Sequence, residues 1–214
     1  MGSFSESVRG GASDLLARTC AHPVLAQLTD GKLPDERFRR WMGQIYLFGR
    51  ESERFVSVLL ARSPREIRRP FSEAMMNTYD DMDIFEEIAK RAGVDTSDLR
   101  MTFACHSYVN FLFTVVHLHS FGEALSAAYG ALYAPYVFWS EVKKVHPAPL
   151  KWQEFVDIWS GEGFAGWIAA HSRAMDSVPG AMPAGLIDRT GEAFRISVHY
   201  HLRFLDMVLE DHDW

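Results

Sequence analysis

The feature that most restricts the fold is a long run of apolar residues at helical spacing in the first third of the chain. Gly31 marks a turn before it, and Pro34 suits the first turn of a helix, where a missing N–H costs nothing. Asp35 and Glu36 follow at the positive end of the expected helix dipole. Apolar residues then recur mostly at steps of three and four, at Phe38, Trp41, Met42, Ile45, Leu47, Phe48, Phe55, Val56 and Leu59. The pattern predicts a helix over about 34–62 with one wide buried face.

Helical spacing continues along the rest of the chain, and no alternating strand pattern or internal repeat interrupts it. We expect further helices over about 6–21, 64–92, 98–119, 121–145, 150–175 and 184–211, the segment 150–175 being interrupted near 160–163. Residues 146–149 (HPAP) break the pattern, and 178–183 form the longest loop candidate. The sequence therefore predicts an all-α bundle of about seven helices in a single domain, 1–214.

Composition limits the classes of partner. Of the 214 residues, 48% are hydrophobic and 13% aromatic, which is typical of a globular chain. The net charge is −6 without a basic run, so nucleic acid and anionic membrane surfaces are not expected partners. No apolar stretch reaches transmembrane length, and the first residues lack the apolar core of a signal peptide. Two cysteines, Cys20 and Cys105, form no disulfide framework, so we expect a cytoplasmic protein.

Motifs in five parts of the chain resemble one known family. They are HPVLAQLTDGKLPDERF at 22–38, SYVNFL at 107–112, SFGEAL at 120–125, WSGEGF at 159–164 and YHLRFLDM at 200–207. Their order and spacing resemble those of the TenA family (thiaminase II), which shares a heme-oxygenase-like bundle with the PQQ-synthesis protein PqqC. The resemblance covers residues 15–210 and implies the heme-oxygenase-like fold and a small-molecule substrate.

Three departures from the family pattern bear on function. Hydrolytic members have an aspartate where this chain has Ile45, and a nucleophilic cysteine in the helix where residues 130–136 read GALYAPY. The catalytic glutamate of the last helix falls on His201. Thiaminase chemistry needs a nucleophile and an acid or base to serve it. The chain is therefore not expected to be a standard thiaminase II.

The resemblance implies an internal aromatic pocket. Flat aromatic rings suit a planar nitrogen-containing or aromatic ligand, and Gly49 leaves room that widens the cavity. Gln44 is either a satisfied core amide or a pocket residue. The predicted substrate-binding residues are Gln44, Ile45, Phe48, Phe85, Tyr108, Trp159 and Tyr200. Because histidine exchanges protons near neutral pH, His201 is the predicted general acid or base, although a core or surface histidine fits the pattern equally.

Metal chemistry is a further alternative, because the same bundle hosts di-iron oxidases. Such sites repeat carboxylates followed by histidine on neighbouring helices. Here Phe85 stands where the resemblance would place a histidine, and Ser197 precedes His201 by one turn. Glu51, Glu53, Asp80, Asp81 and Asp83 fit solvated helix faces. We therefore predict no bound metal or cofactor.

Two functional classes remain open from the sequence. The first is a hydrolase or a cofactor-free enzyme in the manner of PqqC, and the second is a ligand-binding homologue without catalysis. The family resemblance also implies a homo-oligomer, a dimer or tetramer. Tyr133, Tyr136, Phe138 and Trp139 are candidates for its interface, or else for the core.

Overall fold

The computed structural model describes residues 2–146, 150–179 and 184–210, and it describes their side chains except at 70–71, 73–81 and 184. These residues form α-helices and no strand. The helices are α1 (Phe4–Gly10), α2 (Ser13–Cys20), α3 (Pro23–Thr29), α4 (Asp35–Arg62), α5 (Arg65–Arg91), α6 (Phe103–Leu118), α7 (Phe121–Val145), α8 (Gln153–Ser160), α9 (Glu162–Ser177) and α10 (Ala184–Leu209). The predicted all-α class is confirmed. In the described part of the chain, no helix has both the length and the apolar character of a membrane span.

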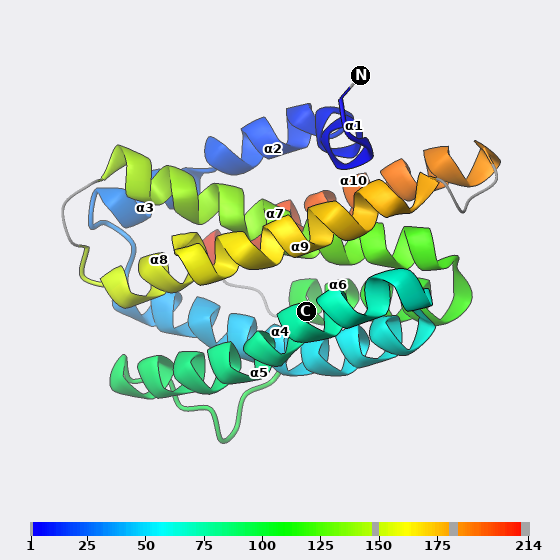
Figure 1. Cartoon of the computed structure of the whole chain (residues 1–214). Coiled ribbons are helices and arrows are strands. Elements are labelled where there is room, and N and C mark those ends of the chain that lie inside the picture. The colour runs from blue at the N-terminus through cyan, green and yellow to red at the C-terminus, as the bar shows by residue number, and fades with distance from the viewer. Residues whose placement is uncertain (1, 147–149, 180–183, 211–214) are drawn as a thin grey trace.

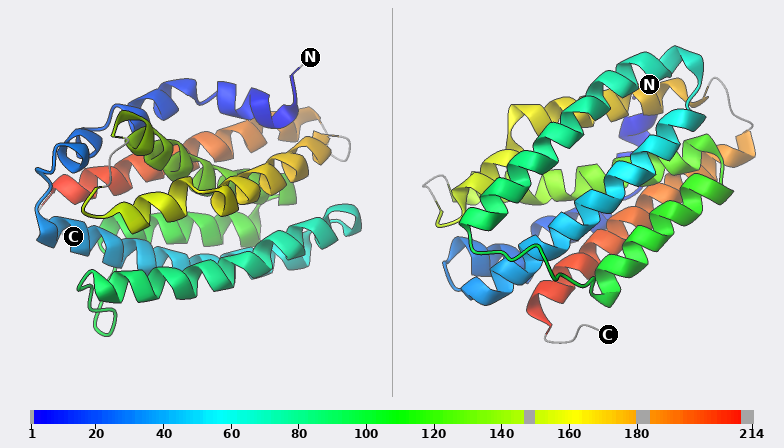
Figure 2. Two further views of the ribbon diagram at one scale, coloured as in Figure 1. Left: turned by 60° about the vertical axis from the view of Figure 1, so that its left-hand side comes forward. Right: turned by 90° about the horizontal axis from the view of Figure 1, so that it is seen from below.

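The long helices lie roughly along one direction and form an elongated bundle (Figure 1). α4 and α5 run side by side along one side of it, and α6 lies next to α10 (Figure 2). α7 packs most extensively against α10 and also contacts α8 and α9. The short helices α1 and α2 cover the opposite side, where they contact α9, α7 and α10. This arrangement surrounds the middle of the bundle with helices.

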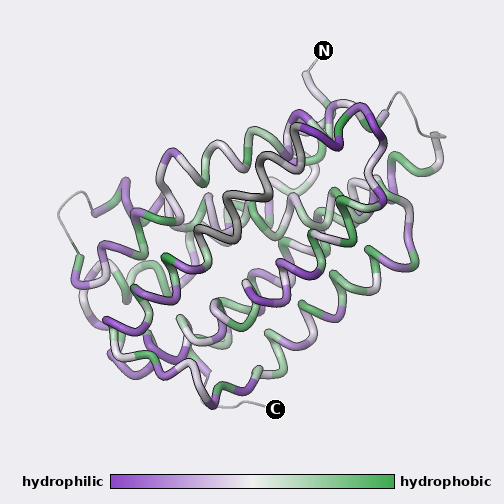
Figure 3. The backbone as a smooth tube through the Cα atoms, turned by 60° about the horizontal axis from the view of Figure 1, so that its bottom comes forward, coloured by the Kyte–Doolittle hydropathy of each residue, from purple (hydrophilic) through white to green (hydrophobic). Residues whose placement is uncertain are grey.

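Most helices carry both hydrophobic and hydrophilic stretches within each few turns, as expected when each helix buries one face (Figure 3). Nearly all of the described buried apolar side chains belong to one cluster, which runs from Val8 in α1 to Val208 in α10. Aromatic rings fill much of it; Trp41 stacks on Trp139 with ring centroids 5.1 Å apart.

The predicted boundaries agree best where a side chain caps the helix. The helix predicted over 121–145 has these bounds, because Ser120 and Glu123 form a reciprocal capping box. The segment predicted over 6–21 is divided into α1 and α2 near Gly10 and Gly11, since glycine destabilises the interior of a helix. α6 begins at Phe103 rather than near residue 98, since Thr102 provides its N-cap. Most of the predicted loop 178–183, and the end of the last predicted helix at 211, lie outside the described residues.

The turn predicted at Gly31 is present, with a φ of 68° at this glycine, and residues 23–29 before it form a helix of their own. His22 is its N-cap; Val24 N–H donates to its Nδ1 at 3.3 Å. The other ring nitrogen, Nε2, therefore carries the proton and donates to Asp206 Oδ1 at 3.1 Å. His22 thus joins the start of α3 to α10.

Two of the four aromatic residues that were candidates for an interface or for the core belong to the core. Phe138 and Trp139 are buried in the core, where both pack against Trp41. Tyr133 and Tyr136 are only partly buried. The expectation of a homo-oligomer stays a prediction that rests on the resemblance alone.

Gly130 lets α7 approach α10 closely, and we predict that Gly130→Ala destabilises the protein. A Cβ at this position would lie 2.8 Å from Ser197 Cβ and 3.0 Å from the Phe194 carbonyl oxygen. Overpacking of this kind costs about 1–3 kcal/mol. The control is Gly166→Ala in α9, where a Cβ would meet nothing within 4 Å, so better helix propensity should stabilise by about 0.5–1 kcal/mol. Urea unfolding measures both, and equal shifts of the two variants would contradict the prediction.

Candidate functional site

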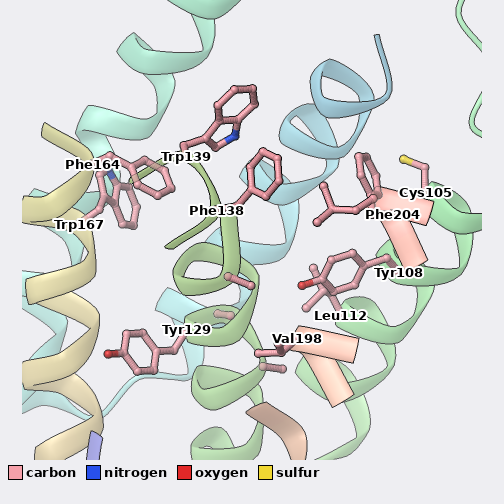
Figure 4. Packing of buried hydrophobic residues seen from close by; sticks show 14 of the residues in the cluster. Cys105, Tyr108, Leu112, Tyr129, Phe138, Trp139, Phe164, Trp167, Val198 and Phe204 are labelled. Carbon is pink, nitrogen blue, oxygen red and sulfur yellow. The ribbon is translucent and has the colours of Figure 1, made fainter. Parts of the chain in front are cut away.

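A cavity of about 140 Å³ lies inside the bundle, between α4, α5 and α6 on one side and α7 to α10 on the other. Its walls are mostly apolar, and nearly half of the lining residues are aromatic. The aromatic lining residues are Trp41, Phe48, Phe55, Phe85, Tyr108, Trp139, Trp159, Phe164, Trp167 and Phe204. Figure 4 shows several of them, with Tyr108 and Leu112 extending from α6 toward α7 and with Phe164 and Trp167 carried by α9. The cavity therefore offers flat apolar surfaces to a ligand.

Most of the predicted site residues meet at this cavity. The lining includes Ile45, Phe48, Phe85, Tyr108, Trp159 and His201. Their rings contact one another in part; Phe48 lies 4.9 Å from Tyr108, and Phe85 lies 5.9 Å from Trp159, between ring centroids. Residues from α4, α5, α6, α8 and α10 thus converge on one space.

Gln44 does not line the cavity. It is 4% exposed, its Nε2 donates to the Arg100 carbonyl at 2.9 Å, and its Oε1 accepts from Thr102 N–H at 2.9 Å. These bonds hold the segment that leads into α6. Of the two interpretations of Gln44, the structure supports the satisfied core amide.

Tyr200 also lies outside the lining, contrary to the expectation that it surrounds the pocket. It stacks on Tyr108, with centroids 5.3 Å apart and planes 9° apart, and on Phe111 at 5.1 Å. Tyr200 follows Ser197 by three residues and precedes His201 by one, so it points about 100° away from His201 around α10. It supports Tyr108 without forming part of the cavity wall.

Gly49 lines the cavity but does not simply widen it. A Cβ there would lie 2.4 Å from the sulfur of Met82, so the methionine side chain occupies the space that glycine leaves. Met82 itself lines the cavity. The glycine therefore brings α4 and α5 close together at the wall.

The hydroxyl of Tyr108 belongs to a buried chain of hydrogen bonds with a defined direction. Ser197 Oγ donates its only proton to the Ala127 carbonyl at 2.8 Å. Tyr108 must therefore donate to Ser197 Oγ, 2.8 Å away, and its oxygen keeps only lone pairs. Burial raises the pKa of Tyr108 well above its usual range, against the opposing bond to Ser197, so the phenol stays protonated. Ser52, also in the lining, donates its proton to the Phe48 carbonyl at 2.8 Å.

Two buried nitrogen atoms at the cavity have no hydrogen-bond partner in the described part of the chain. They are Trp159 Nε1 and His201 Nε2, and both residues belong to the lining. Trp159 Nε1 can only donate, whereas His201 Nε2 donates or accepts according to its tautomer. Because an unpaired buried polar group is costly, each needs an explanation. A ligand that pairs with both supplies one.

His201 is uncharged in this environment. Burial, and to a lesser extent the nearby His22, lowers its pKa to about 3. The residue is 8% exposed. Neutral imidazole therefore faces the cavity at neutral pH, as a hydrogen-bond partner or a base rather than as a cationic acid.

Neither the thiols nor the acidic side chains of the described residues make a nucleophile or a metal site at this cavity. Cys105 is buried, its Sγ donates to the Gln44 carbonyl at 3.6 Å, and burial raises its pKa to about 12. Neither Cys105 nor Cys20 lines the cavity. The described residues contain no group of three potential metal ligands. Glu51 and Glu53 pair with arginines, while the side chains of Asp80 and Asp81 lie outside the described residues.

Sequence reasoning missed much of the wall. Trp139, predicted for an interface or the core, and Trp41 stack on one another in the lining. Trp167 follows Phe164 by three residues on α9, a helical spacing that signals a shared face. Pro135, inside α7, also lines the cavity, and a proline within a helix is itself a signal.

Comparison with known proteins places this architecture in a family. The profile of the TENA/THI-4/PQQC family matches residues 12–211. The aminopyrimidine aminohydrolase of Bacillus subtilis (strain 168) is 21% identical over 217 residues, which cover 99% of this chain and 92% of that protein.

Solved structures with the same fold include a TenA homologue from Pyrococcus furiosus, at 25% identity and a TM-score of 0.89, covering 96% of this chain and 99% of that one. A putative TenA-like thiaminase from Sulfolobus solfataricus has 15% identity and a TM-score of 0.82, with both chains fully covered. The fold is thus the all-α heme-oxygenase-like bundle. From the profile match over nearly its whole length, the chain belongs to the TENA/THI-4/PQQC family.

Proposed function

We propose that the protein binds a small, uncharged, planar nitrogen heterocycle in the aromatic cavity and acts on it with His201 as general base. The observation that carries the proposal is the pair of buried, unpartnered nitrogens, Trp159 Nε1 and His201 Nε2, at one cavity. A heterocycle with a ring nitrogen offers a lone pair to Trp159, while the aromatic walls cover its faces.

The size of the cavity supports a ligand with a single ring. An engineered protein cavity of about 150 Å³ binds benzene, and this cavity measures about 140 Å³. A two-ring cation such as thiamine would exceed that volume. It would also lose its hydration without a counter-charge, since the described lining residues include no acidic side chain. This agrees with the absence of an aspartate at Ile45 and argues against standard thiaminase II activity.

An aminopyrimidine fits these demands, and the Bacillus subtilis relative is named for hydrolysing one. In such a reaction water adds to the ring carbon that bears the amino group, and ammonia leaves as a hydroxyl replaces it. Neutral His201 has a ring nitrogen free to accept the proton of the attacking water. The proton then returns to the departing amino group, so no cofactor is needed.

A second candidate is a ligand-binding protein without catalysis. It is favoured by the low pKa of His201, because a base whose pKa lies near 3 is weak at neutral pH. The described lining also lacks a thiol nucleophile. Ammonia release from 4-aminopyrimidine separates the two candidates, because both bind the ring and only the enzyme consumes it.

The binding step is tested with Trp159→Phe, which keeps an aromatic wall and removes the N–H. We expect pyrimidine to stabilise the unchanged protein against heat, by about 2.7 kcal/mol at 100 times its Kd. In Trp159→Phe the affinity for pyrimidine should fall by about tenfold, the equivalent of one hydrogen bond, while benzene binds equally to both proteins. Titration calorimetry and thermal shift provide the measurements.

The matched control is Trp152→Phe, since Trp152 lies outside the cavity lining and stacks on Phe38. This variant should bind pyrimidine as the unchanged protein does, even if it is less stable. If pyrimidine and benzene each fail to bind the unchanged protein, the proposed function is wrong.

A further inference from the structure

Pro135 lies inside α7, ten residues before its end, and leaves one backbone carbonyl without its helical donor. In an α-helix, the carbonyl of each residue accepts from the N–H four residues later. Proline has no N–H, so the Ala131 carbonyl cannot make this bond, and the proline ring pushes it outward. No described hydrogen bond from outside the helix reaches the Ala131 carbonyl either.

This carbonyl lies on the face of α7 that forms the cavity wall. Ala128, Ala131, Leu132, Pro135 and Trp139 all line the cavity, at steps of three and four. A helical carbonyl points along the axis toward the residue four positions later. Since both Ala131 and Pro135 line the cavity, the carbonyl between them belongs to the same face. One turn earlier, the Ala127 carbonyl accepts an additional bond from Ser197 Oγ, so its environment is satisfied.

The other polar groups of the lining show which ligand groups the Ala131 carbonyl would be combined with. Ser52 and Tyr108 have committed their protons within the protein, Trp159 Nε1 is a donor, and His201 Nε2 is the base assigned above to the attacking water. The cavity therefore has an N–H for a ring nitrogen and, separately, a carbonyl that lacks its usual helical donor. A ligand that satisfies both carries an acceptor in its ring and an N–H group outside it.

We propose that the Ala131 carbonyl, released by Pro135, accepts an N–H of an amino-substituted ring and so selects amino-substituted over unsubstituted heterocycles. The inference rests on the proposed function, because it names the group that reads the ligand in the same cavity. Selectivity follows from the cost of leaving the carbonyl unpaired against a ligand that lacks the N–H. A methyl group is similar in size to an amino group and donates nothing, so the pair 4-aminopyrimidine and 4-methylpyrimidine isolates the bond.

The test is Pro135→Ala, which restores an N–H and lets the helix itself satisfy the Ala131 carbonyl. We expect the unchanged protein to bind 4-aminopyrimidine about tenfold more tightly than 4-methylpyrimidine. In Pro135→Ala this preference should fall to about onefold to twofold, mainly through weaker binding of the amino ligand. Alanine is a better helix former than proline, so the variant should fold. Pro135→Gly restores the same N–H without a side chain and should behave alike.

Changes of cavity shape are separated from the hydrogen bond by the methyl ligand, because altered shape weakens both ligands together. Leu132→Val, on the same wall, should reduce both affinities by a similar factor and keep the tenfold ratio. Retention of the ratio in Pro135→Ala and Pro135→Gly, or a ratio near one in the unchanged protein, overturns the inference. In those cases binding of both rings leaves the proposed function standing; if neither ring binds the unchanged protein, both proposals fail.

Discussion

Replacing His201 with alanine is expected to reduce ammonia release from 4-aminopyrimidine by at least about 100-fold, the lower limit for loss of a positioned base. His201 Nε2 is buried at the cavity and has no hydrogen-bond partner among the described residues. The substitution therefore removes the imidazole that is the proposed base. The fold should survive, because His201 Nε2 makes no hydrogen bond to the described residues that the substitution could break. Steady-state kinetics with an ammonia-coupled assay measure the effect.

His199→Ala is the matched control, since His199 lies two residues away on α10, is exposed and does not line the cavity. Its activity should equal that of the unchanged protein. Activity retained in His201→Ala would contradict the assignment of the base. Loss of turnover in both variants would point to damage of α10 rather than to chemistry.

Burial of His201 also makes the stability of the protein depend on pH. Its pKa falls from 6.5 to about 3 in the folded state because of burial and the nearby His22. The unfolded chain therefore takes up a proton that the folded chain refuses, and stability is lost as the pH falls from about 6.5 toward 3. His201→Ala should lose this part of the pH dependence in urea unfolding, whereas His199→Ala should keep it.

Much of the fold could be predicted because the information is local. Helices such as α7 combine a capping serine, an acidic residue three positions later and a long apolar pattern, and these act within a few residues. The beginning of α6 could not be placed, because residues before Thr102 fit a helix equally well and are fixed by Gln44, 58 residues away from Thr102. A tertiary contact therefore fixes the first residue of α6, which the local sequence pattern does not determine.

The candidate site divides in the same way. The resemblance assigned Phe48, Tyr108 and His201 to a pocket, and all three side chains line the cavity. It also included Tyr200, which stands next to His201 in the sequence but points to another side of α10. Neither resemblance nor periodicity reveals that Trp159 Nε1 is left without a partner, because a missing contact depends on every neighbouring element at once.

Phe38→Ala is expected to have the largest effect on stability, a loss of about 3–5 kcal/mol. Phe38 is 0% exposed; it stacks on Trp152 with ring centroids 4.3 Å apart and planes 7° apart. It also meets the edges of Phe155 at 5.3 Å and Trp41 at 6.1 Å. Truncation removes these ring contacts, which add about 0.5–1.5 kcal/mol per pair to area burial, and leaves a cavity between α4 and α8 that rigid neighbours cannot fill. Since domains are usually stable by only about 5–15 kcal/mol, the variant should unfold roughly 10 °C earlier or more.

Phe103→Ala is the control for this prediction, because it makes the same change at a side chain that is 60% exposed at the start of α6. Its stability should stay within about 0.5 kcal/mol of the unchanged protein. Urea and thermal unfolding of the three proteins provide the comparison. Equal losses in the two variants would mean that the aromatic cluster around Phe38 does not hold α4 against α8.

Because Phe38 lies outside the cavity lining, ligand at saturating concentration should not rescue Phe38→Ala more than it stabilises the unchanged protein. A larger rescue would show that the packing of Phe38 and the shape of the binding cavity are coupled through Trp41, which touches both.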